Sequence, residues 1–532
     1  MADGEEGRPT RPSFCTRERA RCAPIALRGE SGDDRMAPRQ VREPPAEEAD
    51  PLAIDYIFHP QSVAVVGVSP PQWGPAGVGA GFLMALQDLK FEGPIYPVNP
   101  HHQEILGLKC YPSLLDIPDP VDHVIFSVPV PAVPQVIEDC VAKRVKSIHF
   151  FTAGFSETGE AEAAELERRI VARARGAGIR LIGPNCMGIY CPSGKIAFMP
   201  NSPVEPGPVG FLSQSGGNAG DVIFMAAPRG IRFSKIISYG NAADLNECEL
   251  LEYLAEDPET EIIIAYIEGV RDGRRFLRAL RHASARKPVV VLKGGRTEAG
   301  EKAVFSHTAS LAGSARVFDA LLRQAGAVRV DSIDELIDLA IAFRFIGPPA
   351  GRGVAVVGPG GGFSVFAADE VNEAGLELPD LSPAVQEELR RFTPVAGTSV
   401  RNPVDTNVIM EPHKLTDTLR IVAGDPGIHA VLFHIGFGWG GWRRGVQQDQ
   451  PLPFDPAMVV KAMADAIVRA QESTTEPIIL VVRSALDAGS QRFSLQFQEQ
   501  CWRQGVAVFP SIPRACNAIA KMVRWREMRE DV

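Results

Sequence analysis

Residues 62–68 read Ser-Val-Ala-Val-Val-Gly-Val, an almost unbroken run of β-branched and small apolar residues. A continuous apolar run of this length predicts a strand that is covered on both faces, as in a parallel sheet. The run ends in Gly67-Val68-Ser69, and a glycine-rich stretch over residues 73–79 follows it. A glycine-rich turn between a buried strand and a helix is typical of the first unit of a doubly wound α/β domain.

Similar apolar runs recur along the next part of the chain, and a segment rich in Ala, Glu and Arg (Glu160–Arg175) lies between two of them. Alternating strands and crossover helices predict a parallel sheet. The expected strands of this first domain, residues 51–200, are Ser62–Val68, Ile95–Val98, His123–Val128, Ser147–Phe151 and Arg180–Ile182.

Two more series of buried runs follow. We expect strands at Val209–Ser213, Lys235–Tyr239, Glu261–Ile267 and Pro288–Leu292, and then at Gly353–Val357, His429–His434, Pro477–Val482 and Gly505–Phe509. Proline-rich stretches near 201–208 and 347–352 mark the joints between the series. The sequence therefore predicts an α/β protein of three consecutive doubly wound domains, with boundaries near residues 200 and 347.

Composition narrows the class of protein. The 532-residue chain has a formal net charge of −10, from 55 basic and 65 acidic residues, which disfavours a nucleic-acid-binding surface. No apolar run approaches the roughly 18–20 residues that span a bilayer, and no signal-peptide core is visible. We therefore expect a cytoplasmic protein without a membrane or nucleic-acid partner.

The cysteines and the N-terminal segment carry further expectations. The nine cysteines form no CxxC pair, and Cys186 and Cys191 lie far along the chain from other ligand types, so no metal site is expected. Residues 1–50 are dominated by Pro, Arg and Glu and are expected to be a disordered tail. An alternative is that Met36 is the true start and that residues 1–35 are not translated.

The first strand and its turn raise the question of a nicotinamide cofactor. Glycines after a first strand allow backbone N–H groups to approach a phosphate, which makes Gly67 and Ser69 candidate binding residues. A dinucleotide site also needs an acidic residue at the end of the second strand, to bind the ribose. That strand ends in Tyr96-Pro97-Val98-Asn99-Pro100, without Asp or Glu, so NAD is disfavoured.

A second candidate site follows the strand at 209–213. Ser213-Gln214-Ser215-Gly216-Gly217 joins this buried strand to the next helix. Hydroxyls, small residues and free N–H groups at a helix N-terminus form a cradle for phosphate. An ordinary helix cap explains the same residues equally well, and the pattern alone leaves both interpretations open.

Two further residues belong to this set of candidates. His307 stands beside Phe305 and a run of small residues, where a loop would let the imidazole swing and act as a nucleophile toward a phosphoryl group. Glu268 ends an apolar strand, at the edge where ligands of open α/β sheets bind. A strand-end carboxylate that faces solvent is the alternative for Glu268.

Several motifs in order resemble those of the NDP-forming acyl-CoA synthetases, the relatives of succinyl-CoA synthetase. The resemblance rests on Asn99-Pro100, Ala153–Glu157, Gly183–Gly188, Ser213–Gly217, Tyr239–Asn241, Tyr266–Gly269, Lys293–Gly295 and Ser306–Gly313. It is strong over residues 52–345 and looser over 350–525. The domain order resembles that of the α subunit of the two-subunit acetate–CoA ligases (ADP-forming).

The resemblance implies a Rossmann-like CoA-binding domain followed by two flavodoxin-like ligase domains. It implies that His307 is phosphorylated and that Glu268 steadies the phosphohistidine through its other ring nitrogen. Ser213, Ser215, Gly216 and Gly217 would then hold the phosphoryl oxygens. The implied CoA-binding residues are Gly67, Ser69, Asn99, Pro100, Asn185 and Cys186, with Cys186 acting as small packing rather than as a nucleophile.

In the third domain, Gly358-Pro359-Gly360-Gly361-Gly362 again joins a strand to a helix. The resemblance implies that Gly361 and Gly362 bring a second helix N-terminus to the same phosphate, whereas a simple tight turn is the alternative. One segment departs from the family pattern: Trp439 and Trp442 stand beside two arginines. These residues would line an acid pocket, form a subunit contact or lie on an exposed loop.

No ATP-grasp domain is visible in the sequence. The resemblance therefore implies a hetero-oligomer in which a separate ATP-grasp β subunit binds ADP/ATP, or GDP/GTP, with Mg²⁺. The implied activity is an acid–thiol ligase that interconverts acyl-CoA, phosphate and NDP with a small carboxylic acid, CoA and NTP. The alternative function is a catalytically silent regulatory protein that binds CoA or acyl-CoA.

Overall fold

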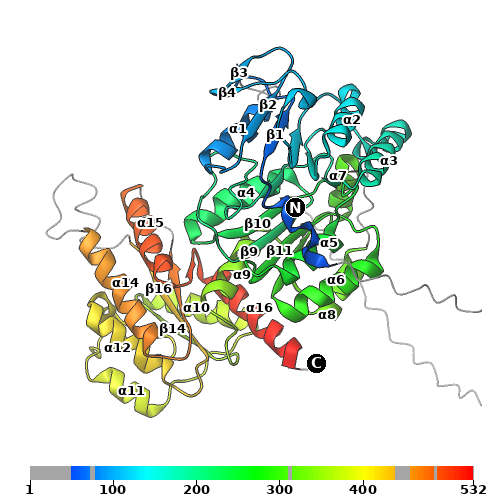
Figure 1. Ribbon diagram of the computed structural model, residues 1–532. Helices are drawn as coiled ribbons and strands as arrows, with labels where there is room; N and C mark the ends of the chain where they lie inside the picture. The colour runs from blue at the N-terminus through cyan, green and yellow to red at the C-terminus, as the bar shows by residue number, and fades with distance from the viewer. Residues whose placement is uncertain (1–49, 72–77, 309–313, 438–455, 484–487, 531–532) are drawn as a thin grey trace, which may run out of the picture. The chain divides into compact units, whose positions relative to one another are not determined.

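The computed structural model describes residues 50–71, 78–308, 314–437, 456–483 and 488–530 (Figure 1). The expected tail over residues 1–49 lies outside this described part. Three mainly parallel sheets of five, six and five strands follow one another along the chain, as the sequence predicts. A two-stranded hairpin, β3 (Glu104–Ile105) with β4 (Leu108–Lys109), is added to the first sheet's domain.

The first sheet has the strand order β2-β1-β5-β6-β7. Its strands are β1 (Val63–Val66), β2 (Ile95–Val98), β5 (His123–Phe126), β6 (Ser147–Phe150) and β7 (Arg180–Ile182), and its helices are α1 (Val78–Asp88), α2 (Val133–Lys143) and α3 (Ala161–Gly176). Successive residues of a strand face opposite sides of the sheet. Val63 and Val65 pack in one apolar cluster with α1, whereas Ala64 and Val66 pack in another with α2 and α3.

The second sheet has the order β13-β12-β11-β9-β10-β8. Its strands are β8 (Gly188–Tyr190), β9 (Val209–Ser213), β10 (Phe233–Ser238), β11 (Ile262–Ile267), β12 (Val289–Lys293) and β13 (Val328–Val330). Its helices are α4 (Gly216–Ala226), α5 (Glu247–Glu256), α6 (Gly273–Arg286), α7 (Glu298–Thr308), α8 (Ala315–Ala325) and α9 (Ile333–Phe345). Strand β8 is antiparallel to β10, so the chain enters this sheet immediately after leaving the first.

The third sheet has the order β15-β14-β16-β17-β18. Its strands are β14 (Val354–Gly358), β15 (Val404–Asp405), β16 (Ala430–Ile435), β17 (Ile478–Val482) and β18 (Val508–Phe509). Helices α10 (Gly361–Glu373) and α16 (Ile512–Glu530) pack on one face. Helices α12 (Pro412–Ala423), α14 (Pro456–Glu472) and α15 (Ala488–Arg503) pack on the other, and α11 (Pro383–Arg390) contacts α12.

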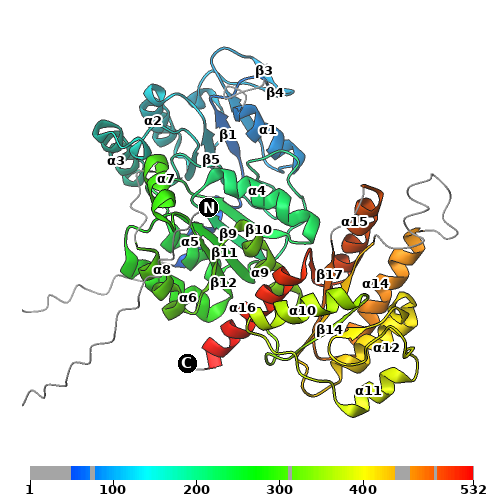
Figure 2. The same ribbon diagram turned by 180° about the vertical axis from the view of Figure 1, so that it is seen from behind.

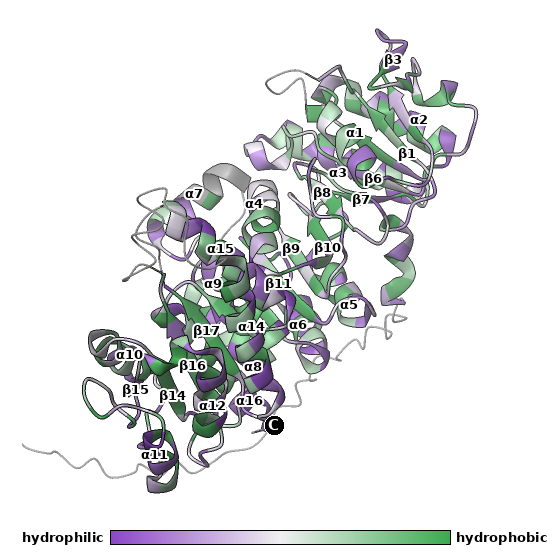
Figure 3. Cartoon of the chain, turned by 90° about the vertical axis from the view of Figure 1, so that its left-hand side faces the viewer, coloured by the Kyte–Doolittle hydropathy of each residue, from purple (hydrophilic) through white to green (hydrophobic). Residues whose placement is uncertain are grey.

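One apolar cluster runs through all three sheets. It contains the α1 face of the first sheet, the strands of the second sheet and the α10 and α16 face of the third. Figure 3 shows the same pattern: hydrophobic strands lie inside, and the covering helices are mixed in character. None of the helices in the described part of the chain has the length and apolar character that a membrane crossing needs.

Helix α16 joins the third sheet to the second, because it contacts both α10 and α9 (Figure 2). At its start, Arg514 Nε donates to Asp338 Oδ2 on α9 at 2.6 Å, and Arg229 pairs with the other carboxylate oxygen. The Asp338 side chain is only 3% exposed. Removing the charge of this buried carboxylate would lower the stability of the fold, because the guanidinium groups would stay partly buried without their partner.

We expect Asp338→Asn to lower the free energy of unfolding by about 3 kcal/mol, since it leaves the partly buried Arg229 without a counter-charge and Arg514 with only the exposed Asp334. Urea unfolding of the purified chain measures this change. The matched control is Asp331→Asn, because Asp331 also pairs with two arginines, Arg296 and Arg329, but its side chain is 53% exposed. The control should cost less than about 1 kcal/mol. Equal losses in the two variants would contradict the importance of burial at Asp338.

Candidate functional site

The turn after β9 forms the expected cradle at the N-terminus of α4. Ser215 is the N-cap of α4, and its Oγ accepts the Asn218 N–H at 3.3 Å. The buried Ser213 hydroxyl donates to the Ser215 carbonyl at 2.7 Å and fixes the turn. The N–H groups of Gly216 and Gly217 lie in the first helical turn, where no intrahelical acceptor exists. They are therefore available to an anion at the positive end of the helix dipole.

Glu268 lies beside this turn, because β11 is the neighbour of β9 and Tyr266 pairs with Ser213. The Gln214 side-chain oxygen accepts the N–H groups of both Glu268 and Gly269, at 2.5 and 3.0 Å. Glu268 is 7% exposed, and its Oε1 accepts the Tyr266 hydroxyl at 3.1 Å. Its Oε2 is buried and has no hydrogen-bond partner among the described residues. A buried carboxylate oxygen normally accepts a hydrogen bond, so this oxygen can accept one from a further donor.

A lysine at the end of the next strand holds the backbone of Glu268. Lys293, at the end of β12, is buried, and its Nζ donates to the Glu268 carbonyl at 2.6 Å and to the Gly294 carbonyl. Burial lowers the pKa of Lys293. A Cβ on Gly294 would lie 2.7 Å from the Tyr266 hydroxyl, so only glycine permits this packing.

Sequence reasoning did not single out the supporting residues Gln214, Tyr266 and Lys293. All three lie within motifs already quoted, which are Ser213–Gly217, Tyr266–Gly269 and Lys293–Gly295. The signal that would have found them is their position at the carboxyl ends of adjacent strands, where polar side chains of parallel sheets converge.

The position of His307 differs in one respect from the expectation. The backbone of His307 lies in the last turn of α7 and not in a loop, because Glu298, Ala299, Glu301 and Lys302 are good helix formers that extend the helix. Helix α7 contacts the turn at Ser156–Thr158, after β6 of the first sheet. The His307 side chain and residues 309–313 lie outside the described part, so the pairing of His307 with Glu268 stays a prediction.

The candidate CoA-binding residues fall at two places on the first sheet. Gly67 and Ser69 follow β1, and Asn99 and Pro100 follow the neighbouring β2. The Asn99 amide donates to the Val68 carbonyl at 2.7 Å and thereby joins the two turns. Gly67 has φ +84°, and a Cβ there would lie 2.7 Å from Val128, so the turn needs glycine.

Asn185 and Cys186 follow β7, at the other end of the sheet, and they lie against the second sheet. The N–H groups of Asn241 and Ala243 donate to the carbonyls of Pro184 and Gly183, at 3.0 and 3.1 Å. Cys186 is 3% exposed, and its thiol points toward the carbonyls of Phe150 and Ile182. Burial raises the pKa of this thiol, which suits the packing role expected for it.

The junction between these two sheets is very tight. Gly240 has φ +52°, and a Cβ built on it would lie 2.2 Å from the Pro184 carbonyl oxygen and 2.3 Å from that of Asn185. Next to it, the Asn241 amide donates to Glu157 at 2.5 Å and to Glu167 at 3.0 Å. The junction therefore holds the strand ends of the first sheet beside the Ser213–Gly217 turn.

In the third sheet, Gly361 and Gly362 open α10, as expected. The turn differs from that of α4 because a carboxylate already lies over it: Asp405 accepts the Gly360 N–H at 2.8 Å. A Cβ on Gly362 would meet no atom within 4 Å, so open space remains beside this residue. The tryptophans at 439 and 442 lie outside the described residues.

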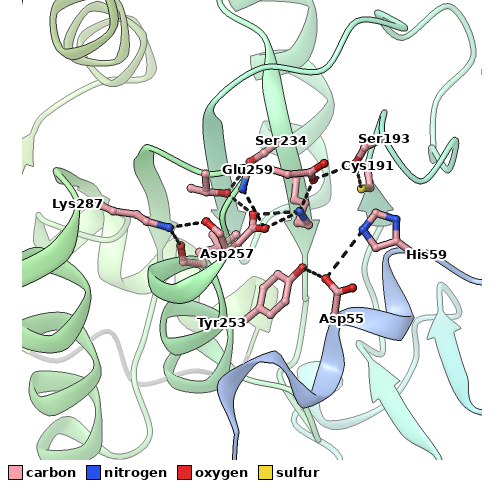
Figure 4. Close-up of polar contacts among 12 residues, drawn as sticks. Asp55, His59, Cys191, Ser193, Ser234, Tyr253, Asp257, Glu259 and Lys287 are labelled. Carbon is pink, nitrogen blue, oxygen red and sulfur yellow. Dashed lines mark hydrogen bonds and ion pairs between the residues drawn. The ribbon is translucent and has the colours of Figure 1, made fainter.

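Cys191 has closer polar neighbours than its place in the sequence suggests. Figure 4 shows Cys191 beside His59 and Glu259, and the possible ligand atoms of the three lie within 4.8 Å of one another. The fold brings together residues that are more than 60 positions apart. Glu259, however, already pairs with the buried Lys235 ammonium at 2.7 Å and accepts the Ser193 hydroxyl at 2.9 Å. An ammonium at this distance competes with any cation. Nearby, the Tyr253 hydroxyl on α5 donates to Asp55 of η1 (Pro51–Ile57) at 2.7 Å, which joins this first helical segment to the second sheet (Figure 4).

Three family models match the chain in succession. They are a CoA binding domain over residues 61–192, a succinyl-CoA ligase like flavodoxin domain over 206–343 and a ligase-CoA domain over 354–476. Each range contains one of the three sheets or most of it.

Similar proteins extend over most of the chain. The α subunit of acetate–CoA ligase [ADP-forming] I from Pyrococcus furiosus is 33% identical over 488 residues, which are 90% of this chain and 99% of that subunit. Acetate–CoA ligase [ADP-forming] I from Archaeoglobus fulgidus is 39% identical over 71% of this chain but only 54% of its own. The structure of a Ca. Korarchaeum cryptofilum acetyl-coenzyme A synthetase 1 in complex with phosphate and ADP superposes with a TM-score of 0.75, at 30% identity, over 90% of this chain and 97% of that one.

We expect Gly240→Ala to lower the free energy of unfolding by at least about 2 kcal/mol more than Gly107→Ala, as measured by urea unfolding. Both glycines have positive φ, +52° and +76°, so both variants carry backbone strain. Only Gly240 would also press its new methyl group into two carbonyl oxygens. If the two variants lose the same stability, the close approach at the junction is not what requires glycine.

Proposed function

Because this chain belongs to the family of NDP-forming acyl-CoA synthetases related to succinyl-CoA synthetase, we propose that it is the α subunit of an acid–CoA ligase of the acetate–CoA ligase (ADP-forming) type. In this proposal, residues 51–200 bind CoA, residues 201–347 carry the phosphohistidine and residues 348–532 form the ligase-CoA domain. The reaction interconverts acyl-CoA, phosphate and NDP with a carboxylic acid, CoA and NTP.

One observation carries the proposal. The buried Glu268 carboxylate keeps an oxygen without a partner among the described residues, directly beside the open first turn of α4. An acceptor and an anion cradle side by side are what a phosphorylated imidazole needs. The cradle binds the phosphoryl oxygens, and the carboxylate accepts the N–H of the ring nitrogen that carries no phosphoryl group.

The proposed chemistry has three steps. Inorganic phosphate attacks the acyl-CoA carbonyl, so that CoA leaves and an acyl phosphate forms. His307 then attacks the phosphorus, which releases the carboxylic acid and leaves phosphohistidine. NDP finally takes the phosphoryl group, and the imidazole returns to its neutral form. A covalent relay replaces one difficult transfer by two easier ones.

The proposed roles of the remaining residues follow from their positions. Gly67, Ser69, Asn99 and Pro100 would bind one end of CoA, at β1 and β2, and Asn185 would lie near the thioester. Neighbouring strands are about 4.8 Å apart, so an extended ligand along the strand ends reaches from β2 to β7. Cys186 would contribute packing and its backbone, since its thiol points inward.

In the third sheet, Gly361 and Gly362 would bring a second helix N-terminus to the phosphate. The open space at Gly362 supports this role. Asp405 already takes the Gly360 N–H, so the phosphate would bind the two glycines that follow it.

The nucleotide and its Mg²⁺ would bind chiefly to an ATP-grasp β subunit, giving a hetero-oligomer. The lengths of the relatives support this assignment: the chain covers 99% of an α subunit but about half of a longer ligase. The seven described cysteines are all free thiols, as in proteins of a reducing compartment, which supports the cytoplasm.

We expect His307→Asn to abolish turnover and phosphorylation while CoA affinity stays within about twofold of wild type. Mass spectrometry at neutral pH or above, after incubation with phosphate and acyl-CoAs, detects the phosphoryl group on the peptide that carries His307. His413→Asn is the control, because His413 is exposed on α12, and it should change nothing. A phosphoryl adduct that persists in His307→Asn would place the relay elsewhere.

We expect Glu268→Gln to reduce the yield of phosphohistidine by at least about tenfold, since a neutral amide stabilises the imidazolium less than a carboxylate does. Quench experiments on the millisecond scale measure both the formation and the decay of phosphohistidine. Glu247→Gln is a suitable control, because Glu247 is also buried but lies on α5. A Glu268→Gln variant that phosphorylates at the wild-type rate would make Glu268 a bystander.

A further inference from the structure

Three side chains that can bind a metal ion converge near the amino-terminal edge of the second sheet. His59 lies two residues after η1, Cys191 directly follows β8, and Glu259 lies three residues before β11. Their ligand atoms lie within 4.8 Å of one another (Figure 4). The Ser213–Gly217 turn follows the carboxyl end of β9, so the cluster lies at the other edge of the sheet and takes no part in the proposed phosphoryl transfer.

The turn after β8 brings Cys191 close to His59. The N–H and carbonyl groups of Cys191 bond those of Ile196, at 2.8 and 3.2 Å, and close a tight turn. A Cβ built on Gly194 of this turn would lie 1.9 Å from the Phe58 carbonyl oxygen and 3.2 Å from His59 Nδ1. Only glycine therefore lets the turn approach the imidazole so closely.

The neighbouring ammonium occupies one oxygen of Glu259 and leaves the other available. Lys235 Nζ and the Ser193 hydroxyl both donate to Glu259 Oε2, at 2.7 and 2.9 Å. Within the described part of the chain, Oε1 accepts no hydrogen bond. Lys235 also donates to both carboxylate oxygens of Asp257, at 3.0 and 2.9 Å. Glu259 can therefore keep Lys235 on one oxygen and bind a cation with the other.

The polar network around the cluster has one negative charge in excess. It contains three carboxylates and two ammonium groups, which are Asp55, Asp257, Glu259, Lys235 and Lys287 (Figure 4). A divalent cation that displaces the proton of the nearby thiol would add one net positive charge. The occupied network would then be neutral, which favours binding in a partly buried place.

The donor set selects Zn²⁺. Thiolate, imidazole and carboxylate are all zinc ligands, whereas Mg²⁺ prefers oxygen ligands and retains its waters. With bonds of about 2.0–2.3 Å, the ligand atoms of a tetrahedral zinc ion lie roughly 3.3–3.7 Å apart, so these atoms must approach by up to about 1 Å. The side chains of His59 and Glu259 are 36% and 40% exposed and can make this movement, while Cys191 is fully buried.

Asp55 can orient the imidazole. Its Oδ1 lies 3.9 Å from His59 Nε2 and accepts the Tyr253 hydroxyl at 2.7 Å. A histidine that binds a metal usually donates the N–H of its other nitrogen to a carboxylate or carbonyl. This arrangement leaves Nδ1, the nitrogen near Gly194, for the ion.

We propose that His59, Cys191 and Glu259 bind one Zn²⁺ ion, with a water molecule as the fourth ligand. The thiol proton is released to solvent when the zinc–thiolate bond forms. The ion fastens the segment before β1 and the turn after β8 to the second sheet, a structural role that is independent of ligase activity. The expectation of no metal site rested on the distance of Cys191 from other ligands along the chain, and the fold removes that distance.

The first test uses Co²⁺, which replaces Zn²⁺ in such sites and absorbs in the near ultraviolet when a thiolate binds it. The chain, freed of metal with a chelator and kept reduced, should bind one Co²⁺ with this absorption, and Zn²⁺ should displace it. Cys191→Ser should lose the absorption. Cys501→Ser is the matched control, because Cys501 is also fully buried but lies on α15. No absorption in wild type, or the same absorption in Cys191→Ser, would overturn the proposal.

The second test asks whether the histidine and the fold take part. We expect His59→Gln to raise the Kd for Co²⁺ at least about tenfold. His282→Gln is the control and should stay within about twofold, because the His282 side chain is 35% exposed and pairs with Glu256 in the same way. Equal changes in the two variants would contradict a site at His59.

Zinc that binds only the folded chain must also stabilise it. The urea midpoint of wild type and of His282→Gln should therefore rise when Zn²⁺ is added, and that of Cys191→Ser should not. A midpoint of wild type that does not respond to Zn²⁺ would overturn the proposal, whatever the ligase activity of the complex.

Discussion

The arrangement of the candidate site depends on the backbone contact between Gly240 and the Pro184-Asn185 turn. No side chain larger than hydrogen fits there, because two carbonyl oxygens occupy the space of a Cβ. The contact aligns the last strand ends of the first sheet with those of the second. In the proposed reaction, the thioester must meet phosphate at the α4 N-terminus, so this junction sets the distance over which the chemistry takes place.

The two glycine turns differ in how each satisfies its helix N-terminus. At α4, the neutral Ser215 hydroxyl caps the helix and leaves the dipole uncompensated. At α10, the Asp405 carboxylate already accepts the Gly360 N–H and partly offsets the positive end of the dipole. The α4 turn is therefore the stronger anion site of the two. In the proposed reaction α10 adds only the N–H groups of Gly361 and Gly362 to the same phosphate.

The sequence predicted the strands well because buried parallel strands are apolar on both faces and produce unmistakable runs such as Val63–Val66. It missed five strands of only two or three residues: β8, β13 and β15, which lie at sheet edges, and β3 and β4, which form a separate hairpin. The prediction that the backbone of His307 lies in a loop was wrong, because the helix-forming residues before it extend α7 as far as Thr308.

Residues that act through tertiary contacts were the hardest to predict. Glu268 and the Ser213–Gly217 turn stand in recognisable local patterns, and the structure places them side by side. Gln214 and Lys293 support Glu268 only because β9, β11 and β12 are adjacent, whereas Tyr266 supports it from β11 itself. His434 lies inside an apolar run that predicts a strand, and nothing in the sequence indicates that its two nitrogens have no hydrogen-bond partner among the described residues.

The most direct test of the relay is a single-turnover pulse and chase. The chain is incubated with an acyl-CoA and ³²P-labelled phosphate, separated from small molecules by rapid gel filtration, and mixed with the ATP-grasp subunit and ADP. The account predicts that label stays with the chain and then moves to ATP, without passing through free phosphate. Label that does not stay with the chain, or that stays but never reaches ATP, would contradict a phosphohistidine relay.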